Sequence, residues 1–148
     1  MADWEALSEG IRFDAWANGL WLDYLNESGA GEPDVSILKH ALSASTIWLS
    51  RIEGESLTSM PTVELSHDTI SKLRDGWVEA LATHTDDPVI HFKRTTGEAM
   101  SRSVSEIVTH VVNHGTYHRG ELRGLCRAKE IENFPETDRI RYSFLTIP

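Results

Sequence analysis

SVSEIVTHVVNHGTYHRGELRGL, residues 103–125, carries the strongest structural signal in the chain. It opens with Ser103-x-x-Glu106, the pattern of a capping box at a helix N-terminus. Apolar residues and histidines then recur at gaps of three and four, which places them on one helical face. They are Ile107, Val108, Val111, His114, His118, Leu122 and Leu125. The stretch predicts a long amphipathic helix with two histidines on its apolar face.

Three similar amphipathic patterns precede this helix, over residues 4–26, 33–53 and 66–85. Their ends carry suitable capping or first-turn residues: Asp3, Pro33, Gly54 and Ser66. Residues 89–95 and 98–102 flank a Thr-Gly turn and are expected to pair as a short hairpin. Four helices of similar length predict an all-α fold, a four-helix bundle with a short β-hairpin before the last helix.

Length and charge narrow the class of protein. A chain of 148 residues predicts one domain, over residues 1–148. Its net charge of -9 argues against nucleic acid or an anionic membrane as a partner. No apolar run approaches the ~20 residues that span a bilayer, and the acidic start Met-Ala-Asp-Trp-Glu does not resemble a secretory signal. One cysteine, Cys126, excludes an internal disulfide. We expect a cytoplasmic protein that acts on a small molecule.

Three histidines are candidates for a metal site. His114 and His118 lie one turn apart on the apolar face of their helix, and His40 lies on the apolar stripe of the second helix. A divalent metal would satisfy all three rings, because neutral imidazole is a favoured ligand of zinc, nickel and iron. Three histidines also leave a coordination position open, as in reactive sites. The alternative is that each ring hydrogen-bonds a neighbour within the bundle.

The other four histidines are weaker candidates for the metal site. His110 extends the row, but a helix rotates by about 40° over four residues, so the rings of His110 and His118 diverge by about 80°. We therefore expect His110 at the rim of the site or in solvent. His67, His84 and His91 lie near predicted helix ends and in the hairpin, and we expect them at the surface.

Arginines and the cysteine of the last helix offer further candidates. Arg119, Arg123 and Arg127 recur every four residues, and they predict either an anion clamp at the rim of the site or a solvated helix face. Cys126 lies eight residues beyond His118, about 12 Å along the helix axis, so we expect it to pack in the core.

The motif His110-Val-Val-Asn-His114-Gly-Thr-Tyr-His118-Arg-Gly resembles the fourth-helix signature of the DinB (DinB/YfiT-like) superfamily of metal-binding four-helix proteins. Similar support comes from FDAWAN at residues 13–18, LKH at 38–40, FKRTTGE at 92–98 and PETD at 135–138. The resemblance covers almost the whole chain. Two features depart from it: Glu121 stands where relatives often have glutamine, and residues 127–134 are charged where relatives usually place a glycine-containing turn.

The resemblance implies a site and a range of functions. It assigns a divalent metal to His40, His114 and His118, with zinc expected first and nickel or iron as alternatives. It implies a metal-dependent enzyme, either a transferase that uses a low-molecular-weight thiol or a hydrolase. The alternative is a non-catalytic metal-binding or stress-response protein. Relatives also pair through bundle helices, and the aromatic-rich residues 4–24 favour a homodimer if their apolar surface exceeds what one core absorbs.

Overall fold

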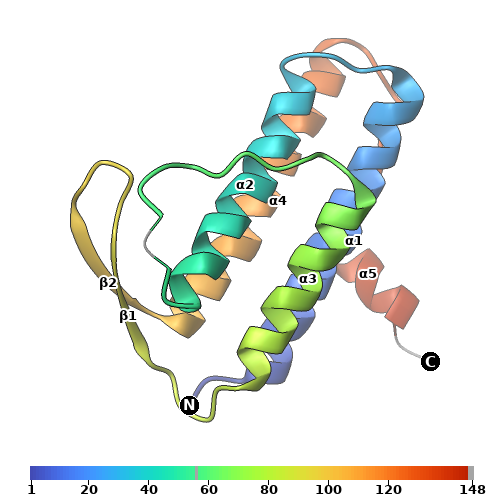
Figure 1. The fold of residues 1–148 in the computed structure, drawn as a ribbon. Helices are drawn as coiled ribbons and strands as arrows, with labels where there is room; N and C mark the ends of the chain where they lie inside the picture. Colours follow the sequence, from blue (N-terminus) through green and yellow to red (C-terminus); the bar gives the residue numbers. More distant parts are fainter. Residues whose placement is uncertain (56, 147–148) are drawn as a thin grey trace.

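The computed structural model describes residues 1–55 and 57–146 and contains the four long helices that the sequence predicts (Figure 1). These helices are α1 (Trp4–Ser28), α2 (Asp34–Ile52), α3 (His67–Ala82) and α4 (Val104–Ala128). A two-stranded hairpin, β1 (Val89–Lys93) and β2 (Ala99–Ser103), precedes α4. A short helix, α5 (Arg139–Thr146), follows it and was not predicted. The mostly helical fold with one small hairpin confirms the predicted fold class.

Side-chain caps begin three of the long helices at the predicted residues. Asp3 accepts a hydrogen bond from the backbone N–H of Ala6, and Ser66 accepts one from that of Thr69. Ser103 and Glu106 form the complete capping box at α4, each side chain bonding the other's backbone N–H. These bonds satisfy helix N–H groups that have no partner within the helix, so the sequence fixes where each helix begins.

The helices do not alternate in direction along the chain. Figure 1 shows α1 and α4 running one way and α2 and α3 the other, with residues 57–66 of the connector crossing α2 to the start of α3. That connector is long because a chain that continues in the same direction must first return along the length of a helix. In this arrangement α4 packs against both α1 and α2, so residues on α2 and α4 can share a site.

The two larger of the three apolar clusters in the core lie along the bundle. One surrounds Trp77 and includes Ile11, Leu81, Ile107 and Val111. The other surrounds Trp21 and includes Leu22, Leu38, Leu42 and Leu122, with Cys126 buried beside them as predicted. The indole N–H groups of the two tryptophans donate to Ser45 and Thr137. Within the described residues, none of the helices combines the length and apolar character needed to cross a membrane.

The short helix α5 covers aromatic residues of α1. Its Tyr142 is buried against Phe13 and Trp16, with ring centroids 6.0 and 5.5 Å apart. Trp21 is buried as well, and Trp4 and Tyr24 are half-buried. The aromatic residues of α1 are thus partly or fully covered within one chain, which reduces the apolar surface on which the predicted homodimer was based. The homodimer itself stays a prediction.

Candidate metal centre

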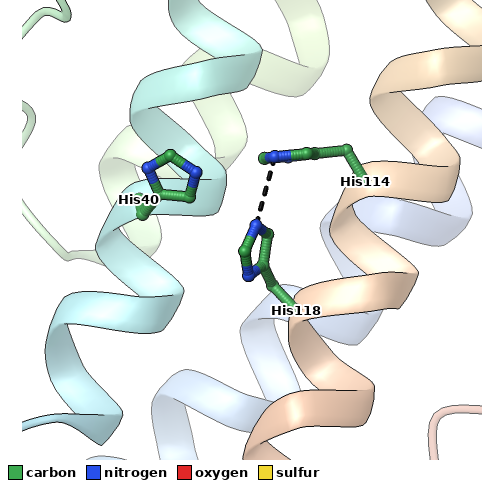
Figure 2. A group of neighbouring side chains, drawn as sticks. All are labelled: His40, His114 and His118. Atoms are coloured by element: carbon green, nitrogen blue, oxygen red, sulfur yellow. Dashed lines mark hydrogen bonds between the residues drawn. The ribbon is translucent and has the colours of Figure 1, made fainter.

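His40, His114 and His118 face one another across the seam between α2 and α4 (Figure 2). His40 comes from the first half of α2, while His114 and His118 come from successive turns of α4. One ligand-type nitrogen from each ring lies within 4.8 Å of the other two. The structure therefore brings together the three histidines that the sequence singled out, from two helices far apart in the chain.

The nitrogen positions fit a divalent metal. His114 Nε2 and His118 Nε2 are 3.1 Å apart. Two nitrogens that bind one ion at 2.0–2.1 Å in tetrahedral or octahedral geometry lie about 3 Å apart, so this pair has the separation that adjacent ligands need. The His40 ring centroid is 4.8 Å from that of His118 and 5.2 Å from that of His114. A small movement of His40 would complete a three-nitrogen face.

The histidines lie at the edge of the bundle and not in its core. His40 is exposed, and His114 and His118 are half-buried. This differs from the prediction that all three rings point from apolar stripes toward the interior. The reason is that the seam between α2 and α4 opens to solvent at these positions, so one side of the cluster remains accessible.

Burial and neighbouring rings favour the neutral form of His114 and His40. Burial, assisted by the neighbouring rings of His118, His110 and His40, lowers the pKa of His114 to about 4. Partial burial and then repulsion by His118 lower the pKa of His40 as well, while Glu121 acts in the opposite direction. A neutral imidazole keeps a nitrogen lone pair, which is the form that binds a metal.

Glu121 orients His118. Its Oε2 lies 3.0 Å from His118 Nδ1, one turn along α4. A carboxylate there favours the proton on Nδ1 and leaves the lone pair on Nε2, which faces His114 Nε2; this is the arrangement found around histidines that bind metals. The sequence identified Glu121 only as a departure from relatives. The signal that could have found its role is the three-residue spacing from His118 on one helical face.

A cleft of about 730 Å³ adjoins the histidines, between α2, the start of α4 and the hairpin. His40 and His110 line it, together with Trp48 and Phe92, whereas His114 and His118 do not. His110 packs its ring against Trp48, with centroids 5.4 Å apart. The structure thus puts His110 in the wall of the cleft, and His40 where the cleft meets the histidine cluster.

Arg119 does not lie at the rim, which corrects the sequence prediction. It is 3% exposed and donates to Asp14 and Asn18 of α1, at 2.6 and 2.7 Å. Adjacent residues on a helix point about 100° apart, so the residue after His118 faces α1 and not the site. The alternative prediction of a solvated face is also wrong for Arg119. Arg123 is half-buried and pairs with Glu136, whereas Arg127 is exposed.

The three remaining histidines lie outside the cluster. His67 and His91 are exposed, as predicted, and contact Asp23 and Ser101. His84 differs: it is half-buried, its ring lies 5.4 Å from that of Trp4, and its Nε2 is buried with no partner among the described residues. The sequence predicted that His84 lies at a helix end and at the surface. It does follow the end of α3, but the ring of Trp4 from α1 packs against it and partly buries it.

Comparison with known proteins agrees with the resemblance seen in the sequence. The family model described as DinB family matches residues 23–128, which include all three histidines. The chain is also 26% identical over 129 residues to Protein DinB of Bacillus subtilis (strain 168), covering 77% of this chain and 74% of that protein. The family match covers the C-terminal end of α1, from residue 23, and all of α2, α3 and α4. The chain belongs to the DinB family.

Proposed function

We propose that the protein is a metal-dependent enzyme that holds a divalent ion, zinc in the first instance, with His40, His114 and His118. The observation that carries the proposal is the convergence of three histidine nitrogens beside an open cleft. A structural metal site is normally closed by four protein ligands, whereas a catalytic site leaves a position for substrate or water. Within the described residues, no fourth cysteine, histidine or carboxylate joins this cluster.

The reaction class that the resemblance to the DinB superfamily favours is transfer to or from a low-molecular-weight thiol, with hydrolysis as the close alternative. A divalent ion there would lower the pKa of a thiol or water that binds it. The side chains of the chain itself supply orientation. Glu121, 3.0 Å from His118 Nδ1, favours the proton on that nitrogen. The aromatic walls formed by Trp48 and Phe92 suit a substrate with an apolar part.

The test is an activity screen tied to metal content. The purified protein, metal-loaded or stripped with a chelator, is given thiols with electrophiles in one panel and amides in another. We expect a stoichiometric divalent ion and turnover in one panel that disappears on stripping and returns with metal. Turnover that survives confirmed metal removal would contradict the proposal. Stoichiometric metal without turnover in either panel would favour the non-catalytic metal-binding function.

A further inference from the structure

Arg51, at the end of α2, is a buried cation without an acidic partner. It is 7% exposed, yet no carboxylate of the described residues forms a salt bridge with it. Its Nη2 donates to the backbone oxygen of Lys93 at 3.3 Å, and its Nε is buried with no hydrogen-bond partner among those residues. Burial and the nearby charge of Arg94 lower its pKa. Buried charges are normally paired, so this guanidinium has capacity for an anion.

Two aromatic rings fix the guanidinium in place. Its central carbon lies 4.5 Å from the ring centroid of Trp48 and 4.8 Å from that of Phe92. Such cation–π contacts stabilise the charge and limit its rotation. They do not use its N–H groups. Apart from the one that Nη2 donates to Lys93, these groups have no protein acceptor among the described residues and can take part in the two-pronged recognition of a carboxylate or phosphate.

The surrounding cleft is locally positive in a chain of net charge -9. Arg102 lines the same cleft as Arg51, and so does Arg94, which pairs with Glu98 at 3.1 Å. One acidic residue also lines it, Glu106, whose carboxylate accepts hydrogen bonds from Ser103 in the capping box. Three arginines exceed the two nearby carboxylates, Glu106 and the Glu98 that pairs with Arg94, so the cleft attracts anions although the whole protein is negatively charged.

The floor of the cleft connects this cation to the histidines. Arg51 follows His40 by eleven residues on α2, a rise of about 16 Å along the helix axis. Apolar Ala44 and Ile47 line the cleft between them. A ligand that spans this distance would need an anionic end, an apolar body and a far end at the histidines.

We propose that the Arg51 end of the cleft is an anion-binding subsite, and that the cleft takes an elongated organic anion, a carboxylate or a phosphate monoester with an apolar body. That its far end reacts at the histidines rests on the function proposed above. The anion subsite itself does not, because Arg51, Trp48 and Phe92 belong to the chain with or without a metal.

The test measures binding by calorimetry to the full-length, metal-stripped protein, so that no ligand binds through a metal. The probes are phenylbutyrate, phenylbutyl phosphate and the neutral phenylbutanamide. We expect one or both anions to bind about tenfold or more tightly than the amide, because hydrogen bonds to a charged partner are the strong ones. The tighter anion identifies the natural headgroup. Equal affinity for the amide and both anions would overturn the proposal.

Variants locate the subsite. Arg51→Gln should abolish the preference for the anion, and Arg51→Lys should keep only part of it, because lysine lacks the planar fork. Arg127→Gln makes the same charge change at an exposed position on the far part of α4 and should leave the preference intact. An undiminished preference in Arg51→Gln would overturn the assignment. If circular dichroism shows that Arg51→Gln is unfolded, Arg94→Gln on the exposed hairpin replaces it in the test. A weaker preference for the anions over phenylbutanamide in Arg94→Gln would support the subsite, and an unchanged preference would overturn it.

Metal content, measured separately on the unstripped protein, distinguishes failure of the proposed metal-dependent function from failure of the proposed anion subsite. A preference for anions in a protein that never binds metal would overturn the proposed function and leave the subsite standing. A metal-dependent enzyme that does not distinguish phenylbutyrate or phenylbutyl phosphate from phenylbutanamide would overturn the subsite alone.

Discussion

Arg119 donates a hydrogen bond to Asp14 Oδ1 at 2.6 Å inside the bundle, one residue after His118 on α4. Asn18, one turn further along α1, donates to the same carboxylate and accepts from the same guanidinium. Because neighbouring side chains on a helix diverge by about 100°, anchoring Arg119 to α1 turns His118 toward α2. The buried pair thereby fixes the rotation of α4 that brings the histidines together.

Breaking this pair should destabilise the fold. Arg119→Met leaves Asp14 buried without its partner, and we expect a loss of about 3 kcal/mol in the free energy of unfolding, measured by urea denaturation. The double variant Asp14→Leu with Arg119→Met should recover part of that loss, because no unpaired charge remains. Arg123→Met, which removes a half-exposed arginine from the same helix, should cost much less. Equal losses in Arg119→Met and Arg123→Met would contradict this account.

Gly115 should tolerate no side chain. A Cβ there would clash with Asp14 Oδ1 and lie 2.9 Å from Arg119 Nη1, so even alanine must disturb the ion pair. We expect Gly115→Ala to lower the free energy of unfolding by more than about 1 kcal/mol. Gly124→Ala, where the added Cβ meets open space on the same helix, should instead stabilise by roughly 0.5–1 kcal/mol. Thermal melts of the two variants should shift in opposite directions, and a shift in the same direction would be inconsistent with this packing.

Metal content should separate the three clustered histidines from His110. His40→Ala, His114→Ala and His118→Ala should each lose the stoichiometric ion, because each removes one of the converging nitrogens. His110→Ala should retain it, since its ring lies in the wall of the cleft against Trp48. Elemental analysis of the four purified variants provides the measurement. Retention of metal in His40→Ala, or its loss in His110→Ala, would show that the ligand set is wrong.

Glu121 should strengthen metal binding without itself being a metal ligand. Glu121→Ala removes the carboxylate 3.0 Å from His118 Nδ1, and we expect metal to bind about tenfold more weakly, because the ring loses its fixed orientation. Glu130→Ala, an exposed carboxylate beyond the end of α4, is the matched control and should bind normally. Competition with a chromophoric chelator gives both affinities. An unchanged affinity in Glu121→Ala would exclude this role.

The stability of the metal-free protein should depend on pH through His114. Its pKa is about 4 in the folded protein against 6.5 for an ordinary histidine. Between pH 6.5 and about 4, His114 therefore binds a proton in the unfolded chain but not in the folded protein. The free energy of unfolding should be greatest above pH 6.5 and should fall as the pH drops toward about 4. The lowered pKa of His40 acts in the same direction. In urea titrations across this range, His114→Gln should show a shallower pH dependence, whereas His91→Gln, on the exposed hairpin, should match the unaltered protein.

Local patterns sufficed for most of the secondary structure. The helices begin after the predicted capping residues Asp3, Ser66 and Ser103. These caps are predictable because the capping side chain accepts a hydrogen bond from a backbone N–H only two or three residues away. The spacing of His114 and His118 likewise placed their rings together, since residues four apart are neighbours on any helix. His40 was singled out by its place on the apolar stripe of the second helix, and the family resemblance then assigned it to the same site. No local rule relates α2 to α4, so the meeting of the three rings depends on tertiary packing.

Tertiary packing settled the surroundings of the site. Arg119 and Arg123 share a four-residue spacing, yet one is buried against Asp14 and the other is half-exposed, because α1 covers only part of the face they share. The helix spacing could not show that Arg51 would meet Phe92, which lies on β1 more than forty residues away. Helical periodicity reports which side chains share a face; what lies opposite that face depends on contacts between distant segments, and those exist only once the chain has folded.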